Sequence, residues 1–295
     1  MFRLDLLERF ALSQMYAKLP KYCDSWLFGS RIQPESKGGD IDILLQADIS
    51  TSEQIELSQK LTLEFQSHCE EKIDVVVCPK TNLTLEQSEF IRAINRIPLD
   101  SVVNAPLLDH VAVLVSDLDE CRQKIRDWGF FLQAEQNFEG EGTRECYVGE
   151  NERPSRVLLL QAVKDGPYQS TFQKRGAGLH HIGVTVFSLG DFLQKLHGTG
   201  WQIHPASPAN RDAEGPVYLY GKNVPLILEV SQRPPLKPSI LAPVVQRVRV
   251  RTTHELVNTI SCMNINELSW SVDEETSIMV SGYWKSIRSI AGYVD

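Results

Sequence analysis

The sequence is short of cysteine, of positive charge and of long apolar runs, and each shortage excludes a class of protein. Its six cysteines lie apart, without the paired short spacings of a disulfide framework or a thiolate zinc site. Lysine and arginine number 30 against 38 aspartates and glutamates, and the net charge of −8 predicts no nucleic-acid partner. No apolar run is long enough to span a membrane, and the charged, amphipathic N-terminus lacks the core of a signal peptide. We therefore expect a cytoplasmic protein without membrane contacts.

Length and composition predict a globular chain of several domains. The chain has 295 residues, of which 42% are hydrophobic and 23% charged, enough for two or three packed cores. Proline-bearing segments divide it into predicted domains at residues 1–98, 106–233 and 243–295. The predicted fold class is α+β: an α/β domain, then paired βαβββ modules, then a small strand, helix, strand, strand extension in which we find no chemistry.

Acidic residues begin or interrupt two predicted strands of the first domain. The stretch "WLFGSRIQPESKGGDIDILL" places Gly29 and Ser30 after one apolar run and Asp40 and Asp42 at the start of the next. Alternate residues of a strand share a face, so these two carboxylates project together and repel each other unless a cation bridges them. Asp74 interrupts the following apolar run. Three such acids on adjacent strands can hold two magnesium ions for attack on a nucleotide phosphate.

This pattern resembles the signature of the minimal nucleotidyltransferases of the DNA polymerase β superfamily, over roughly residues 10–80. The resemblance implies transfer of a nucleoside monophosphate from ATP or another NTP by two-metal catalysis with Mg²⁺. It implies metal ligation and catalysis by Asp40, Asp42 and Asp74, and triphosphate binding by Gly29, Ser30, Arg31 and Lys37. The alternative is structural: Asp-Ile-Asp also occurs at solvated strand edges, Gly-Ser is common in turns, and a loop cation is usually a surface group.

The second domain contains an internal repeat. "LLDHVAVLVSDLDECRQKI" from residue 107 resembles "GLHHIGVTVFSLGDFLQKL" from residue 178, and three strand-like runs follow each copy. His110 and His181 coincide in the two copies. The interval that separates them also separates Leu158 from Glu229.

The paired modules resemble the vicinal oxygen chelate superfamily, which includes glyoxalase I, methylmalonyl-CoA epimerase and extradiol dioxygenases. In that family two modules form a cup whose metal ligands come from the first and last strands of each module. The resemblance implies that His110, His181 and Glu229 are metal ligands, for Fe²⁺, Mn²⁺ or Zn²⁺, and that Leu158 stands where a fourth ligand is expected. Two histidines and one carboxylate match the facial triad of non-haem iron oxygenases. An aliphatic group beside the metal is also what a decayed site would have.

Other polar residues of these strands receive weaker interpretations. Tyr147, Tyr218 and Tyr220 fall in middle strands, where side chains that line the cup are expected. His180 neighbours His181, and strand alternation predicts that it faces the opposite side in a structural role. The alternative for the predicted ligands is that the histidines are satisfied by packing and that Glu229 points outward.

Three functions remain open from the sequence. The main prediction is a nucleotidyltransferase that moves a nucleoside monophosphate to a hydroxyl or amine, with the cup binding this small-molecule acceptor. The alternative is a metal-dependent dioxygenase, lyase or epimerase of the vicinal oxygen chelate type with a regulatory N-terminal domain. A third is a non-enzymatic protein that binds a small ligand. Because modules of this type often pair across chains, a homodimer is also predicted.

Overall fold

The computed structural model describes residues 2–33, 36, 39–150, 153–205, 207, 215–222, 224, 226–232, 243–254, 256 and 265–291. The chain divides into two compact units at the boundary between Ala105 and Pro106. Both mix helices with sheets, so the predicted α+β class is confirmed. In the described ranges, every helix is too short or too polar to cross a membrane.

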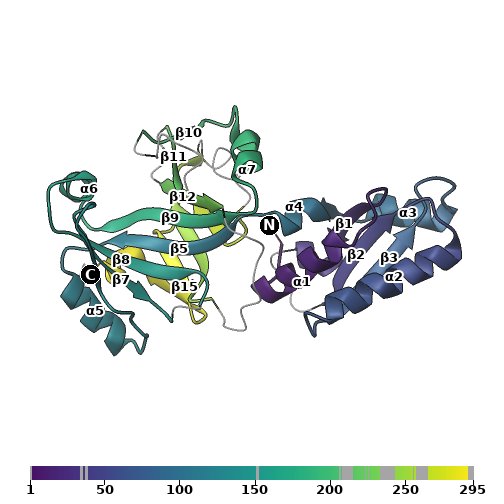
Figure 1. Ribbon diagram of the computed structural model, residues 1–295, viewed down its shortest axis with the longest axis horizontal. Coiled ribbons are helices and arrows are strands. Elements are labelled where there is room, and N and C mark those ends of the chain that lie inside the picture. The colour runs from purple at the N-terminus through teal and green to yellow at the C-terminus, as the bar shows by residue number, and fades with distance from the viewer. Residues whose placement is uncertain are drawn as a thin grey trace. The chain divides into compact units, whose positions relative to one another are not determined.

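The first unit is a four-stranded mixed sheet with helices on both faces (Figure 1). Its strands, in the spatial order β3-β2-β1-β4, are β1 (Asp24–Phe28), β2 (Ile41–Gln46), β3 (Ile73–Cys78) and β4 (Arg96–Pro98). Strands β2 and β3 are parallel, whereas β1 is antiparallel to both of its neighbours. The helices are α1 (Leu6–Ala17), α2 (Thr51–Gln66), α3 (Leu85–Ala93) and α4 (Leu99–Val103), and a 3₁₀ turn covers Gly29–Ile32.

Apolar side chains of α1, α2 and α4 pack against one face of this sheet, and those of α3 against the other. The larger core contains Leu12 of α1 and Phe65 of α2, both fully buried. Helices α1, α2 and α3 each begin with a capping box, in which two residues pair and the side chain of each accepts a hydrogen bond from the backbone N–H of the other. The residue pairs are Asp5 with Glu8, Ser50 with Glu53, and Thr84 with Gln87.

The second unit contains an eight-stranded sheet built from the two repeated modules (Figure 1). Its order is β10-β11-β12-β9-β5-β8-β7-β6, so the modules meet where β5 and β9 pair antiparallel. The first module contributes β5 (Leu107–Leu114), β6 (Gln136–Phe138), β7 (Thr143–Val148) and β8 (Arg156–Ala162). The second contributes β9 (Gly178–Val186), β10 (Trp201–Ile203), β11 (Val217–Gly221) and β12 (Ile227–Gln232).

The two faces of this sheet are covered differently. Helices α5 (Leu118–Asp127) and α7 (Leu189–Leu196) share the large core on one face. The opposite face carries a smaller apolar cluster, which includes Ala112 of β5 and Leu158 of β8. Tyr168 and Phe172 pack on this cluster from α6 (Pro167–Arg175), a helix that the sequence analysis did not foresee.

The C-terminal segment forms a third sheet that shares the core of the second unit. Its order is β14-β13-β15-β16, and its strands are β13 (Val245–Arg251), β14 (Leu268–Ser271), β15 (Ser277–Val280) and β16 (Tyr283–Ser286). The fully buried Val245, Val248 and Ile278 lie in the same cluster as Val111 of β5. A short helix, α9 (Ile287–Ile290), follows. The helix predicted between the first two strands of this segment falls largely outside the described residues.

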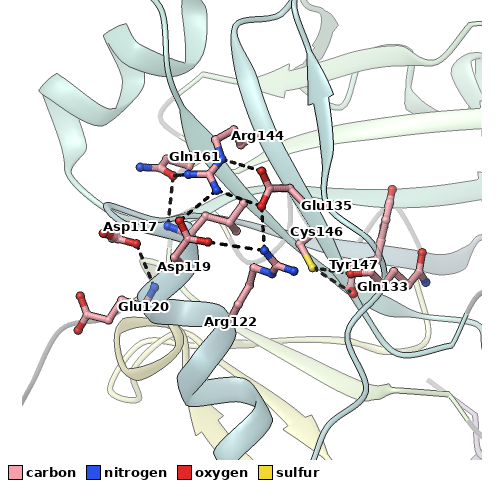
Figure 2. Close-up of polar contacts among 11 residues, drawn as sticks. Asp117, Asp119, Glu120, Arg122, Gln133, Glu135, Arg144, Cys146, Tyr147 and Gln161 are labelled. Carbon is pink, nitrogen blue, oxygen red and sulfur yellow. Dashed lines mark hydrogen bonds and ion pairs between the residues drawn. The ribbon is translucent and has the colours of Figure 1, made fainter.

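A network of ion pairs holds β7 against α5 and β8 (Figure 2). Arg144 of β7 donates to Glu135 at 2.7 Å and to Asp119 of α5 at 3.0 Å. It also donates to Gln161 of β8 at 3.2 Å, and Arg122 of α5 donates to Glu135 at 2.8 Å. Since side chains alternate along a strand, anchoring Arg144 on this face directs the next residue of β7 to the other face.

Candidate metal centre

The structure brings together the three residues predicted as metal ligands in the second unit. His110 comes from β5, His181 from β9 and Glu229 from β12, and one ligand atom of each lies within 4.8 Å of the others. The two Nε2 atoms are 3.0 Å apart, and Nε2 of His181 is 3.3 Å from Oε2 of Glu229. Both histidines are buried, and Glu229 points inward with them. In the described part of the chain, no other three His, Cys, Asp or Glu side chains converge in this way.

A β-bulge in β5 gives His110 a second partner. The ladder pairs Leu108 with Val184 and then His110 with Gly183, so Asp109 is an extra residue on its strand. The bulge lets adjacent side chains meet on one side of the sheet. Oδ2 of Asp109 lies 2.8 Å from Nδ1 of His110. An Nδ1–H that donates to this carboxylate leaves Nε2 as the acceptor nitrogen, facing the other two ligands.

A second bulge does the same on β9. Ala112 pairs with His181 and Val113 with Leu179, so His180 is the extra residue. Nδ1 of His180 lies 2.8 Å from Nδ1 of His181. The prediction that His180 faces the opposite side was therefore wrong, because the bulge breaks the alternation on which that prediction rested.

Gly183 makes room for the ring of His110. A Cβ on Gly183 would lie 2.8 Å from Nε2 of His110 and closer still to two other ring atoms. Real Cβ atoms do not approach other atoms so closely. The absence of a side chain at this position of β9 is therefore a condition for the observed orientation of His110.

Burial sets the ionisation of the cluster. Burial lowers the pKa of His181, and the neighbouring Glu229 offsets this only in part. Burial also lowers the pKa of His180, to about 3. Burial works to raise the pKa of Glu229, but the hydrogen bond with His181 and the electrostatic influence of His181 and His110 together outweigh it, and the pKa lies below its ordinary value. At neutral pH the buried His181 is neutral and Glu229 is ionised, as metal binding requires.

Two of the three distances between the ligand atoms fit a divalent ion. Two ligands that bind an ion at about 2.1 Å and at right angles lie about 3.0 Å from each other. The Nε2–Nε2 distance of 3.0 Å and the Nε2–Oε2 distance of 3.3 Å are close to this value. Leu158, buried on β8 beside Ala112, offers no ligand atom. An ion held by His110, His181 and Glu229 would keep open positions for a substrate.

Tyrosines and a further carboxyl surround the cluster. The ring of Tyr147 meets His110 edge-on, with centroids 6.1 Å apart, and burial raises the pKa of Tyr147 to about 12. Tyr218 lies opposite Glu229 across β11 and β12, and burial together with Glu229 raises the pKa of its hydroxyl. Tyr220 instead donates to Gln202 at 2.8 Å. Of the predicted lining residues, Tyr147 and Tyr218 lie beside the cluster.

Glu145 is a potential functional group that the sequence analysis missed. It lies two residues before Tyr147 on β7 and therefore on the same face. Burial raises the pKa of its carboxyl, and Glu141 and Glu229 add to this effect. Thr143 donates to it at 2.6 Å. Strand alternation from Tyr147 was the signal that could have located it.

In the first unit, part of the predicted nucleotide site comes together. Asp42 of β2 and Asp74 of β3 are direct neighbours in the parallel ladder. Gly29, with φ +74°, lies so close to Asp42 that a Cβ would be 2.9 Å from the carboxyl carbon. Burial raises the pKa of Asp42, and Asp74 and Asp40 raise it further. Gly29 is therefore required both by its backbone conformation and by the closeness of Asp42.

The remaining predicted residues of that site have other partners. Asp40 forms an ion pair with Lys72, whose Nζ also lies 3.4 Å from Asp74. Arg31 forms an ion pair with Glu8 at 2.9 Å. The hydroxyl of Ser30 lies against Gly39, where a Cβ would be 3.2 Å from its Cβ. Lys37 falls outside the described residues.

A sequence profile of the Glyoxalase/Bleomycin resistance protein/Dioxygenase superfamily matches residues 109–219. These residues form a vicinal oxygen chelate domain. The match begins at Asp109 and contains both His110 and His181. It lies wholly within the second unit, so the resemblance of the first domain to nucleotidyltransferases stays a prediction.

Three solved structures that are similar to this chain each overlap with less than half of it. A hypothetical protein from Bacillus halodurans C-125 is 20% identical with a TM-score of 0.37, over 45% of this chain and 98% of its own. A methylmalonyl-CoA epimerase from Mycobacterium tuberculosis is 21% identical with a TM-score of 0.35, over 43% of this chain and 88% of its own. The Streptomyces coelicolor epimerase is 20% identical with a TM-score of 0.35, over 44% and 97%. No curated protein sequence matches the chain.

Proposed function

We propose that the second unit is a metal-dependent enzyme of the vicinal oxygen chelate type. It binds one divalent ion through His110, His181 and Glu229 and acts on a small molecule in front of this face of the sheet. The observation that carries the proposal is the convergence of three ligand atoms within 4.8 Å at a buried position. The profile match, which covers His110 and His181, supports it. This function, the alternative of the sequence analysis, replaces nucleotidyl transfer as our first choice.

The reaction that fits these residues best is proton transfer at a carbon next to a carbonyl group, as in an epimerase or a lyase. An ion bound by the three ligands would act as a Lewis acid on a substrate oxygen. The carboxyl of Glu145, whose pKa is raised by burial, would accept and return the proton through its free oxygen. The hydroxyls of Tyr147 and Tyr218 stay protonated and can donate hydrogen bonds to the substrate. Leu158 and Leu160 exclude water from the adjoining surface.

Metal binding is the first test. The purified protein should be analysed for metals, stripped with a chelator and titrated with Fe²⁺, Mn²⁺ and Zn²⁺. We expect one ion per chain for the wild type and loss of binding in H110A, H181A and E229A. H197A is the matched control, because His197 ends α7 and is not among the three converging ligands. Equal metal binding by the ligand variants and the control would refute the proposal.

The proton-transfer step has its own test. With the metal-loaded protein, deuterium exchange from D₂O into the carbon next to the carbonyl of candidate substrates should be followed by NMR. E145Q should retain the metal and lose the exchange, because it keeps the shape of the side chain and removes the base. Exchange at the wild-type rate in E145Q would exclude Glu145 as the base. Metal binding without exchange in any substrate would favour a role in ligand binding.

Nucleotidyl transfer by the first unit remains a second candidate. The observation in its favour is the close approach of Gly29 to Asp42, which is itself in register with Asp74. A non-hydrolysable ATP analogue should bind only when Mg²⁺ is present, and D42A should abolish this binding. E56A, which removes an exposed carboxylate of α2, is the control. Calorimetric titration of the ATP analogue, with and without Mg²⁺, measures this binding. If the wild type shows no magnesium-dependent binding, this function is eliminated.

A further inference from the structure

Arg156 lies beside the candidate metal centre. It begins β8, is the ladder neighbour of His110 in the parallel pair with β5, and shares its face with Leu158. Its guanidinium carbon lies 4.1 Å from the centre of the Tyr147 ring. The same ring meets His110 edge-on. Arg156 and His110 thus contact the same tyrosine.

The guanidinium of Arg156 has no polar partner among the described residues. No hydrogen bond and no ion pair joins it to any residue in the ranges that the structure describes, and its ring contact with Tyr147 leaves the N–H groups unused. The other half-buried arginines of the second unit in these ranges each pair with a carboxylate, and they are Arg122, Arg144, Arg153 and Arg249. The unpaired arginines there, apart from Arg156, are exposed.

This difference marks Arg156 as a candidate residue for binding an anion. A half-buried guanidinium loses part of its hydration, and the loss is offset only when its N–H groups meet an acceptor. Its planar fork of donors matches a carboxylate, which it can bind with two parallel hydrogen bonds. Tyr147 covers one face of the fork and so orients its edge without using a donor. The donor edge of Arg156 is therefore suited to a carboxylate beside the residues proposed as metal ligands.

We propose that Arg156 binds a carboxylate of the substrate, and that the substrate is a small organic acid with a second oxygen function placed at the metal. The inference rests on the proposed metal-dependent function. The carboxylates of Asp109, Glu145 and Glu229 would otherwise disfavour an anionic substrate near this face. The positive charges of one divalent ion and of Arg156 together balance these negative charges. Neighbouring strands are about 4.8 Å apart, so an acid of a few carbon atoms can reach from Arg156 to an oxygen position in front of His110.

Dicarboxylates of increasing length are suitable probes, because one carboxylate can bind the metal and the other Arg156. The full-length protein, loaded with Mn²⁺, should be titrated calorimetrically with malonate, succinate and glutarate, and with acetate, propionate and inorganic phosphate for comparison. We expect at least one dicarboxylate to bind more tightly than every monocarboxylate. R156M should lower the affinity for that dicarboxylate by about tenfold to hundredfold, because it removes a charged, hydrogen-bonded pair. It should leave the affinity for Mn²⁺ unchanged.

Two further variants make the result specific. R156K keeps the charge but loses the planar fork, so its affinity for the dicarboxylate should fall between those of the wild type and R156M. R153M is the matched control: it removes a nearby arginine that already pairs with Glu150, and it should bind all probes like the wild type.

Each other outcome overturns a defined part of the proposal. Equal dicarboxylate affinity in R156M and the wild type, or no dicarboxylate binding at all by the Mn²⁺-loaded wild type, excludes Arg156 as a carboxylate site. If phosphate binds more tightly than every dicarboxylate and its binding requires Arg156, the substrate is a phosphorylated compound and the organic acid is excluded. Failure of the wild type to bind Mn²⁺, Fe²⁺ or Zn²⁺ refutes the metal-dependent function itself, and is read from the metal titration before any acid is added.

Discussion

The close contact between Gly183 and His110 allows the candidate centre to be tested by the substitution G183A, which adds a single methyl group beside the ring. A Cβ at residue 183 would lie 2.8 Å from Nε2 of His110, whereas ordinary contacts start at 3.4 Å, so in G183A the ring must retreat by about 0.6 Å or more. Metal–ligand distances vary by only about 0.2 Å. We expect G183A to weaken binding of Zn²⁺ or Fe²⁺ by at least about tenfold to hundredfold. Isothermal titration of the stripped protein measures this.

The same clash predicts a coupling between the two residues in the metal-free protein. Overpacking of this kind costs about 1–3 kcal/mol. Because H110A removes the ring, G183A should be nearly neutral for the free energy of unfolding when H110A is already present. Urea unfolding with EDTA, followed by tryptophan fluorescence, reports mainly on the second unit, which holds four of the five tryptophans.

Two results would refute this reasoning. One is wild-type metal affinity in G183A. The other is an equal loss of stability from G183A in the presence and absence of the His110 ring. G190A is the control, since a Cβ at Gly190 of α7 meets nothing within 4 Å.

Three further predictions concern both units. D109N should lower metal affinity by about tenfold to hundredfold through the tautomer and orientation of His110, whereas the exposed D165N should not; titration of the stripped variants checks this. L158Q adds an oxygen ligand at the fourth position and should tighten Zn²⁺ binding; weaker binding than in the wild type would contradict the placement of Leu158 beside the ion. Backbone hydrogen bonds from the loop after β3 lower the pKa of Asp48. At pH values above the ordinary pKa of an aspartate, this carboxylate therefore stabilises the first unit, and the stabilisation is lost as the pH falls through the lowered pKa. D48A should therefore lower the urea midpoint at pH 7 more than in acid, and an equal loss at both pH values would contradict the assignment.

Local patterns located many of the residues that now matter. The repeat identified His110 and His181 as equivalent because each module has the same strand and helix pattern, and that pattern is written in residues close in sequence. The three-stranded remainder of each module was predicted too, although β6 and β10 are only three residues long. Its place in a middle strand predicted Tyr147 as a lining residue, and its ring does meet His110 edge-on.

Local patterns failed where the pairing of distant strands decides a side chain's direction. Asp109 and His180 contact the ligand histidines only because β5 and β9 pair with a bulge in each strand. A bulge depends on the register between two strands far apart in the chain, and neither strand carries a signal for it. The prediction for His180 was wrong for this reason.

The sequence by itself determined which chemical groups this protein has and their approximate places on strands, because side-chain periodicity is a property of neighbouring residues. Tertiary structure alone decided which groups meet. It turned Glu229 inward to His181, placed Gly183 under the ring of His110 and left Arg156 without a carboxylate partner among the described residues. It also joined the C-terminal strands to the core of the second unit. These outcomes follow from strand register and packing, which depend on residues far apart in the sequence as much as on neighbouring ones.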